Sequence, residues 1–489
     1  MPENYINCLV LGPEWNQLIC MTKILRTLLC HSLIGLLLTG CASLERYPDN
    51  PRLERYDSQS SMIGLREQGS GDTLLIVTFS GGGTRAAALA YGVLEALNKT
   101  QLGKGDEHQT MLDEIDMISS VSGGSITAAY FGLFGKRIFT DFRGAFLERN
   151  VTAELTSILL TPTTLSRISS ETFGSSDVLD EYFSQLLFGT TPIRQLVDGE
   201  GPFVQINATD LFKGGQFGFT PEQFALICSD INQFQVSRAV AASSAVPMVF
   251  APVTLTNHAG SCDYTPPEWL LHTAGNNSRR DRIAGTMNSY LDRDAHPYIH
   301  LVDGGLADNL GLRAVMDYIV IEGGLWKTLQ RFGLQNVEHI VLLSVNATAL
   351  LPSKWEQSDK TPPTAVILDA ATTTPLANYN FETLEYLRNN LAVWRSEIKR
   401  HRCEDKLKCS APELYLIELR IDDIPDPQLR NRLISVPTDF SLPLDVVNDL
   451  VNAGHLLLHS NPEYQRLLQG VGAVPVPASQ PPPTPAIQQ

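Results

Sequence analysis

The sequence predicts an α/β fold with a mostly parallel central sheet flanked by helices. Residues 73–79, TLLIVTF, form a continuous apolar run that is typical of a strand buried on both faces. A stretch of helical composition follows directly at 84–100. The same order recurs where IDMISSV at 115–121 leads into a helical stretch from Gly124 to about Phe134. Strands that alternate with helices indicate this fold class.

Further segments complete the predicted domain. They are strands at 202–211, 298–305, 339–347 and 414–421, and helices at 380–402 and 444–468. Because no Pro/Gly/Ser-rich linker separates them, we expect one domain over 72–470, with a core at 73–347 and a C-terminal completion at 348–470. The proline-rich residues 471–489 are expected to be a disordered tail.

The first 40 residues read as a leader rather than as part of the fold. From Met21 a short basic segment precedes the apolar run TLLCHSLIGLLL, which is too short to span a bilayer. Residues 1–20 have no signal-peptide character, so we expect translation to start at Met21.

The end of this leader resembles a bacterial lipobox. Leu38-Thr39-Gly40-Cys41 implies that Cys41 is lipidated and becomes the mature N-terminus, although an ordinary signal peptide or an uncleaved anchor remains an alternative. Ala at position 42 favours sorting to the outer membrane of a bacterial cell envelope, with the protein facing the periplasm. Residues 41–71, which are polar and charged, are then expected to be a lipidated tether.

Charge and cysteine content narrow the function classes. A net charge of −16 argues against nucleic acid as a partner and against electrostatic docking on anionic lipid. Outside the leader and anchor, Cys228, Cys262, Cys403 and Cys409 suggest disulfides in an exported protein, with three possible connectivities. The short loop RCEDKLKC favours the pair Cys403–Cys409, and a metal site there is disfavoured.

A glycine-rich loop, SGGG, follows the first strand and permits three interpretations. A phosphate-binding P-loop would need Gly-Lys-Ser/Thr, which is absent. Gly81, Gly83 and Ala86 fit the permissive dinucleotide pattern, but the next strand ends in SSVSGGS without the acidic residue that holds a ribose. The third interpretation is an oxyanion hole, in which the N–H groups of Gly81, Gly82 and Gly83 converge beside a helix N-terminus.

The second strand–helix junction has the pattern of a nucleophile elbow. Ser122 has small residues two positions away on each side, Ser120 and Gly124, as the sharp turn of such an elbow requires. Gly123 would add a further N–H to the oxyanion hole. Alone, this pattern is also compatible with a plain turn, but beside the glycine loop it favours a nucleophilic serine.

The tract HLVDGGLADNLGL supplies a base for that serine. Asp303 ends an apolar strand and would lie at the same edge of a parallel sheet as the other two loops, although a β-turn beginning with Asp is the plain alternative. None of the ten histidines follows a strand as a catalytic triad demands. The sequence therefore predicts a Ser–Asp dyad.

These motifs resemble those of the patatin-like phospholipases. The family's glycine loop matches 81–85, including Arg85 as its loop arginine, its nucleophile matches Ser122, and its Asp-Gly-Gly/Ala motif matches 303–305, with Gly304 in support. The tracts NATDL at 207–211 and AVAASSAVPMVFAPV at 239–253 also match, so the resemblance covers about 73–312. The departures are Ala86 and Ser120, where the family prefers glycine.

The resemblance implies a patatin-like three-layer fold and a lipid acyl ester hydrolase that needs no metal or organic cofactor. Its substrate would be a phospholipid or another acyl-ester lipid, and phospholipase, lysophospholipase and general carboxylesterase activity all remain open. A non-catalytic envelope lipoprotein is the alternative from a different class. Residues 151–180, Ser/Thr-rich and without clear periodicity, are expected to border the substrate entrance as a lid, or else to form a satellite apolar cluster.

Overall fold

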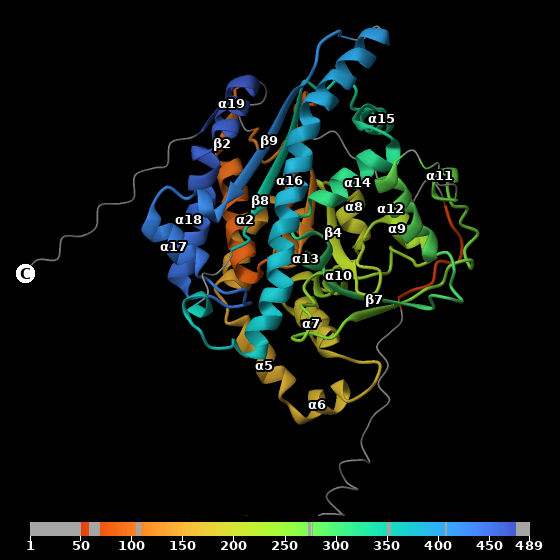
Figure 1. The fold of residues 1–489 in the computed structure, drawn as a ribbon, viewed down its shortest axis with the longest axis vertical. Helices are drawn as coiled ribbons and strands as arrows, with labels where there is room; N and C mark the ends of the chain where they lie inside the picture. Colours follow the sequence, from red (N-terminus) through yellow and green to blue (C-terminus); the bar gives the residue numbers. More distant parts are fainter. Residues whose placement is uncertain are drawn as a thin grey trace, which may run out of the picture. The chain divides into compact units, whose positions relative to one another are not determined.

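A computed structural model describes residues 50–57, 69–103, 109–271, 275, 277–349, 354–405 and 408–475 (Figure 1). The predicted leader, its start at Met21, the lipidation at Cys41 and the tail from 476 onward lie outside these residues. The chain divides into two compact units, Pro48–Ser157 with Ser175–Gln489, and Met1–Tyr47 with Ile158–Gly174. The larger unit contains every residue predicted for the chemistry.

An eight-stranded sheet lies at the centre of the larger unit, in the order β6-β7-β4-β3-β1-β8-β9, with β5 paired to β4. The five strands from β4 to β9 in this order are parallel, whereas β7 and β5 run antiparallel to β4. The expectation of a mostly parallel sheet is therefore confirmed. The strands are β1 (Thr73–Phe79), β3 (Ile115–Val121), β4 (Phe203–Asp210), β5 (Gln216–Gly218), β6 (Val253–Thr256), β7 (Tyr298–Asp303), β8 (His339–Asn346) and β9 (Glu413–Arg420).

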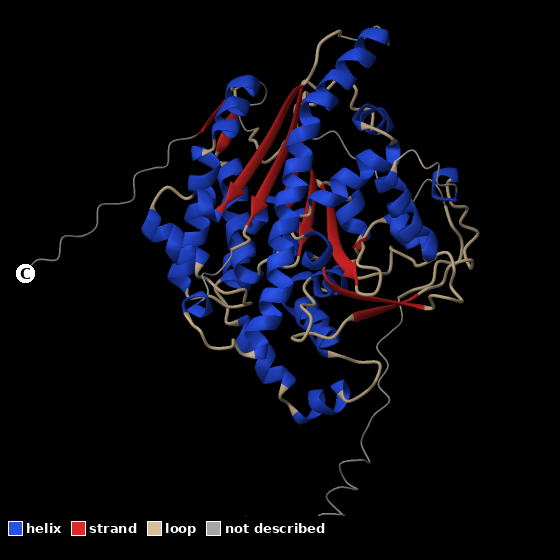
Figure 2. Cartoon of the chain, viewed as in Figure 1, coloured by secondary structure: helices blue, strands red, loops and turns tan. Residues whose placement is uncertain are grey.

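Helices cover both faces of this sheet, as Figure 2 shows. Neighbouring residues of a strand point to opposite faces. On β4, Val204 packs against Gly132 of α3 (Gly123–Phe134), whereas Phe203 packs with Val315 of α14 (Leu312–Glu322). The α14 face also carries α15 (Leu325–Arg331) and α16 (Thr364–Glu404), and the sheet with its two helical layers forms the predicted three-layer fold.

Helices α2 (Gly83–Asn98) and α18 (Leu444–Ser460) pack closely through glycines. A Cβ on Gly92 would lie 2.2 Å from the carbonyl oxygen of Val451, and one on Gly454 would lie 2.8 Å from that of Leu89. Only residues without a side chain permit this approach. Helix α18 is thus an integral part of the layer that supports the first strand–helix junction.

Several shorter elements complete the described chain. They are α4 (Ile138–Phe142), α5 (Val151–Leu159), α6 (Pro162–Ile168), α7 (Ser175–Phe183), α8 (Arg194–Asp198), α9 (Pro221–Leu226), α10 (Val236–Ser243), α11 (Glu268–Leu271), α12 (Ser278–Ser289), α13 (Gly305–Asp308), α17 (Pro427–Ile434), α19 (Pro462–Val471), and the antiparallel pair β2 (Thr100–Leu102) and β10 (Ala473–Pro475).

Two segments differ from the sequence prediction. Residues 151–180 are largely helical, in α5, α6 and α7; the Thr161 hydroxyl caps α6 by accepting the Thr164 N–H at 3.2 Å. Side-chain caps of this kind start helices too short to show a periodic pattern. Helix α16 begins at Thr364 and continues through Pro375, whereas the sequence predicted a start near 380.

The described residues contain two disulfides. The predicted pair Cys403–Cys409 is confirmed, and the other two cysteines form Cys228–Cys262. The middle of the expected tether binds at the second bridge, because Leu53 N–H donates to the Cys228 carbonyl and Tyr56 N–H donates to the Cys262 carbonyl, both at 2.8 Å. Residues 50–57 are therefore bound to the domain.

No helix in the described parts of the chain combines the length and the apolar character that a bilayer crossing requires.

Candidate active site

Ser122 stands at the turn between β3 and α3 with a strained backbone. Its φ of 50° and ψ of −125° are rare for a residue with a side chain. The turn leaves no room two positions later, since a Cβ on Gly124 would lie 2.6 Å from the Ser80 carbonyl oxygen. At the other position, the Ser120 hydroxyl turns away and donates to the Gln205 carbonyl at 3.2 Å. The turn thus has the sharp geometry that the predicted nucleophile elbow requires, and serine is tolerated at 120.

Asp303 reaches the same edge of the sheet by a route that the sequence did not indicate. The expectation assumed a parallel strand, but β7 runs antiparallel to β4 and overlaps only its end, with Asp303 opposite Ala208. Strand β7 therefore runs towards the sheet from outside its carboxyl edge, and it ends at that edge with Asp303. Gly304 follows, where a Cβ would lie 2.3 Å from the Asn207 carbonyl oxygen. That close approach explains the glycine after the aspartate.

The Ser122 side chain lies beside the Asp303 carboxyl and affects its pKa. Burial raises the pKa of Asp303 to about 6, and hydrogen bonds from the Ser122 side chain and the Gly305 N–H oppose this rise. The Gly305 N–H donates to Oδ1 of Asp303 at 2.8 Å. Ser122 is 5% exposed and Asp303 is 8% exposed, so the pair is shielded from bulk water. A buried carboxylate of raised pKa beside a hydroxyl can act as a general base.

The glycine loop lies against the elbow. A Cβ on Gly81 would lie 3.3 Å from Cβ of Ser122, and one on Gly123 would lie 2.0 Å from the Gly83 carbonyl oxygen. The Gly81 N–H is already donated to the Asn309 carbonyl at 3.0 Å, so Gly81 shapes the loop instead of offering an oxyanion donor. Gly82 and Gly83 stand where α2 begins, and Gly123 begins α3. The first N–H groups of a helix have no partner within it.

Arg85 is buried and structural. Its guanidinium donates to the Ala347 carbonyl at 2.9 Å, to the Thr438 hydroxyl at 3.3 Å, and to the Val436 carbonyl. Burial lowers its pKa to about 10. Arg85 therefore supports the site by joining the start of α2 to the end of β8 and to a C-terminal loop, and it is not a solvated helix residue.

Hydrogen bonds from neighbouring elements hold the backbone of the Ser122 turn in place. The Ser122 N–H donates to the Ser243 hydroxyl at 2.8 Å, and that hydroxyl donates to the Asn207 carbonyl at 2.6 Å. The Asn207 amide donates to the Ser119 hydroxyl at 2.9 Å. Both Asn207 and Ser243 lie in tracts that carried the family resemblance, but sequence reasoning gave neither a role. The sequence signal that could have identified them is a polar side chain among small apolar neighbours.

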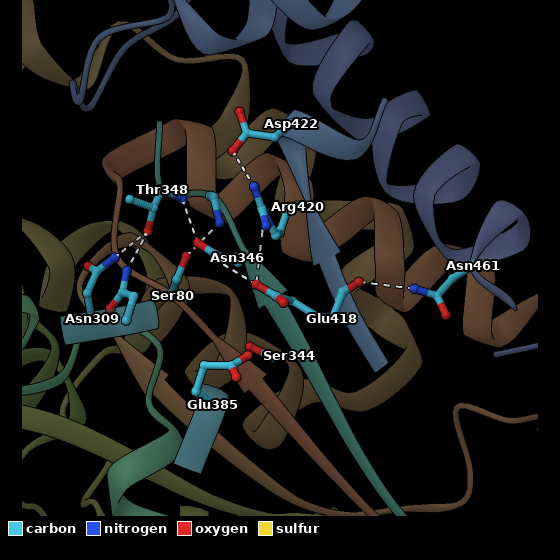
Figure 3. Close-up of polar contacts among 12 residues, drawn as sticks. Ser80, Asn309, Ser344, Asn346, Thr348, Glu385, Glu418, Arg420, Asp422 and Asn461 are labelled. Atoms are coloured by element: carbon cyan, nitrogen blue, oxygen red, sulfur yellow. Dashed lines mark hydrogen bonds and ion pairs between the residues drawn. The ribbon is translucent and has the colours of Figure 1, made fainter. Parts of the chain in front are cut away.

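Asn309 connects the glycine loop to the loop after Asp303, and Figure 3 shows its position beside Ser80 and Thr348. Its carbonyl holds Gly81, while its Oδ1 lies 2.6 Å from the place a Cβ on Gly81 would take and 2.9 Å from that on Gly305. Its Nδ2 donates to the Thr348 hydroxyl at 2.8 Å, which also receives the Asn380 amide of α16 at 3.1 Å. Sequence reasoning missed Asn309, although it lies in the Asp303 tract.

Two further points bear on the predictions. Among the described residues no group of three or more His, Cys, Asp or Glu side chains is arranged to hold a metal ion. The lid proposed for 151–180 falls largely in Ile158–Gly174, which belongs to the smaller unit, so the lid stays a prediction.

Comparison with known families agrees with this geometry. Residues 77–316 match the family described as Patatin-like phospholipase. The chain carries a patatin-like phospholipase domain. The match begins in β1 and ends in α14, so this patatin-like domain contains Ser122, Asp303 and the glycine loop.

Other comparisons add less. A solved structure of human GIVD cytosolic phospholipase A2 aligns at 12% sequence identity with a TM-score of 0.42, over 83% of this chain. The patatin-like chain spans 63% of that phospholipase. No curated protein matches this chain.

Proposed function

We propose that this protein hydrolyses acyl esters of lipids, with Ser122 as nucleophile and Asp303 as its base. The observation that carries the proposal is the pairing of a strained, buried serine with a buried carboxylate whose pKa is raised to about 6. A carboxyl of ordinary pKa is a poor proton acceptor near neutral pH, and burial makes this one stronger while it stays mostly ionised at pH 7. Membership of a phospholipase family supports a lipid substrate.

The chemistry proceeds through an acyl-enzyme. Asp303 accepts the proton of the Ser122 hydroxyl as Oγ attacks the ester carbonyl. The oxyanion that forms is stabilised by N–H groups of Gly82, Gly83 and Gly123, and one such donor contributes about 3 kcal/mol in comparable sites. Asp303 then protonates the leaving alcohol. A water molecule, deprotonated by the same carboxylate, releases the acid and restores Ser122.

We further propose that the enzyme is a bacterial envelope lipoprotein attached through Cys41. The lipobox-like residues Leu38–Cys41 support this attachment. Radioactive palmitate should label the wild-type chain and not the Cys41→Ser variant. Labelling that persists in the variant would contradict the lipid anchor without affecting the proposed chemistry.

A fluorophosphonate probe tests the nucleophile directly, because the probe reacts only with an activated serine. We expect labelling of the wild-type protein and none of Ser122→Ala. A screen of phospholipids, lysophospholipids and short-chain esters with the same preparation then identifies the substrate class. Absence of both labelling and hydrolysis would favour the non-catalytic alternative.

The pH profile tests the base. Asp303 must be ionised to accept a proton, so kcat/KM should fall about tenfold per pH unit below its pKa of about 6. Asp308, whose pKa burial also raises to about 6, is a matched control. The Asp308→Asn variant should retain the same midpoint. A profile whose midpoint disappears in that variant would assign the titration to Asp308 instead.

A further inference from the structure

The turn at 244–250 links the candidate active site to the protein surface. It leaves α10 directly after Ser243, whose hydroxyl accepts the Ser122 N–H at 2.8 Å. One residue into the turn, the Ala245 carbonyl accepts the Asp303 N–H at 2.9 Å. The turn is therefore fixed at its start to both of the proposed reacting residues.

The same turn is anchored at its far end and folded in between. The Ala251 N–H donates to the Ser175 hydroxyl at 2.9 Å, at the beginning of α7. The Val246 carbonyl accepts two N–H groups, from Val249 at 3.2 Å and from Phe250 at 2.9 Å. The Phe250 ring is buried and lies 5.9 Å from that of Phe440. The turn thus has a defined conformation.

Between these anchors the turn presents apolar side chains to solvent. Met248 is 78% exposed and Val249 is 65% exposed, with Val246 partly exposed beside them. Met248 also has a φ of 73°, a conformation that favours glycine or asparagine. A turn that served only to reverse the chain would carry glycine or asparagine at this position. Strain together with exposed apolar side chains points to a binding role.

A second apolar side chain stands next to the same loops. Leu306 lies in the short helix α13, three residues after Asp303, and it is 42% exposed. The chain just before it is bonded to the last residue of α10, from which the turn leaves, because the Gly304 N–H donates to the Ser243 carbonyl at 3.1 Å. We call Val246, Met248, Val249 and Leu306 the apolar rim.

We propose that the apolar rim inserts into a zwitterionic lipid surface and brings Ser122 to its substrate there. The inference rests on the proposed lipid hydrolase activity and adds that the substrate is taken from a lipid aggregate, not from free solution. A net charge of −16 disfavours anionic surfaces, which selects zwitterionic or neutral lipid as the partner. Apolar side chains that enter the headgroup boundary give reversible attachment in proportion to their buried area.

Vesicle flotation tests the surface without the chemistry. The starting protein is the full chain with Cys41→Ser and Ser122→Ala, so that neither an anchor nor hydrolysis contributes. It should float with phosphatidylcholine vesicles and less well with phosphatidylglycerol vesicles. Adding Met248→Ser and Val249→Ser should weaken binding about tenfold or more, given the apolar area each side chain would bury. Phe212→Ser is the matched control, since Phe212 is 79% exposed on the turn between β4 and β5, and its binding should be unchanged.

Activity measurements separate this inference from the proposed function. With Ser122 intact, the Met248→Ser, Val249→Ser protein should lose about tenfold or more of its hydrolysis of vesicle phosphatidylcholine, for the same reason. It should retain hydrolysis of soluble p-nitrophenyl butyrate. An equal loss of hydrolysis on both substrates would contradict the proposed role of the apolar rim. A protein that floats with vesicles through its apolar rim but hydrolyses neither substrate would support the membrane-binding proposal. The same result would contradict the proposed function.

A fluorescence measurement tests the proposal even if the serine variants fail to fold. Met248→Trp, in the Cys41→Ser, Ser122→Ala chain, places an indole at the exposed tip, and its fluorescence maximum should move to shorter wavelength when phosphatidylcholine vesicles are added. An unchanged maximum would overturn the proposal. So would a wild-type dimer in sedimentation that Met248→Ser dissociates, because the rim would then bind a second copy of the chain.

Discussion

The two ends of the same parallel strands differ in how they are packed. At the carboxyl ends, Ser, Asn and Asp side chains are buried and bonded to one another, as Asn207, Ser243 and Asn309 illustrate. At the amino ends, an apolar hollow of about 70 Å³ lies between the sheet and helices α14–α16. Leu74, Ile76, Met117, Phe203, Ile340 and Leu414 of the strands, with Val315, Leu329 and Trp394 of the helices, line it.

The contrast shows where this fold needs exact geometry. Ile76 is in a central strand, yet it is partly accessible because the helices above it leave space. At the other end a Cβ on Gly83 would lie 2.4 Å from the Asp439 carbonyl oxygen, so no space is left at all. Directional bonds need fixed distances, whereas apolar packing tolerates a small void. Substitutions at the carboxyl ends should therefore change activity, whereas substitutions at the amino ends should change stability alone.

The largest expected effect is on the dyad. Ser122→Ala and Asp303→Asn should each lower kcat at least about 10³-fold, and the double variant should lose no more than the worse single one, because nucleophile and base act as a unit. Steady-state kinetics on the substrate found in the screen measures this. Ser125→Ala is the control, since the Ser125 hydroxyl lies 3.1 Å from that of Ser243 and takes no part in the chemistry. Full activity of Ser122→Ala would refute the mechanism.

The second prediction concerns stability at the same residue. Asp303 has a higher pKa folded than unfolded, so its ionised form opposes folding above pH 6 and the opposition disappears as the pH falls towards 4. Asp303→Asn should raise the free energy of unfolding at pH 8 by up to about 3 kcal/mol, since each pKa unit corresponds to about 1.4 kcal/mol. Urea unfolding at pH 8 and at pH 4 measures it. An equal gain at both pH values would contradict this cause.

The third prediction concerns Asn309. Asn309→Ala should lower kcat about tenfold with little change in KM. It removes the side chain that packs against Gly81 and donates to Thr348, and so loosens the loop that presents the oxyanion donors. Asn257→Ala is the matched control: that buried amide donates to two carbonyls, of Tyr290 at 2.8 Å and His296 at 2.9 Å, far from the elbow in sequence.

Both variants should lose similar stability, but only Asn309→Ala should lose kcat. Thr348→Ser should keep activity and Thr348→Val should reduce it, since the Thr348 hydroxyl accepts the Asn309 amide. Equal kcat values for Asn309→Ala and Asn257→Ala would show that Asn309 is merely structural.

The smallest expected effect is at the amino ends. Val315→Ile adds a methylene facing the hollow and should stabilise the protein by less than about 1 kcal/mol, with kcat unchanged. Val204→Ile, on the opposite face against Gly132, should destabilise it by about 1–3 kcal/mol through overpacking. Thermal unfolding of the two variants decides the comparison. A destabilised Val315→Ile would mean that the hollow has no usable space.

Much of the fold could be predicted because its strands are strongly apolar. The runs at 73–79 and 115–121 became β1 and β3 with the predicted bounds. The direction of β7 could not be predicted, since a strand's residues are the same whichever way it pairs. The helices of 151–180 were missed because they are short and Ser/Thr-rich, and the start of α6 is set by the Thr161 cap instead of by periodicity.

The candidate reactive residues were easier to predict from the sequence than the residues that hold them in position. Ser122 and Asp303 each follow an apolar strand and stand beside glycines, which marks them in the sequence. Asn309 and Ser243 act through partners distant in the chain, Thr348 and Ser122, and no local pattern reports such contacts. Gly81 was expected to donate to an oxyanion, but its N–H is engaged by Asn309, a bond that only the tertiary structure reveals.

The bonds of the first α2 turn have a consequence for biosynthesis. The Thr84 N–H donates to the Asp439 carbonyl at 2.8 Å, and Arg85 donates to the Val436 carbonyl. A nascent chain that has reached residue 316 already contains the whole family match, with Ser122, Asp303 and the glycine loop, but not these partners. The loop beside the nucleophile is completed only once residues 436–439 have left the ribosome. The glycine loop therefore depends for its final conformation on the C-terminal part of the chain.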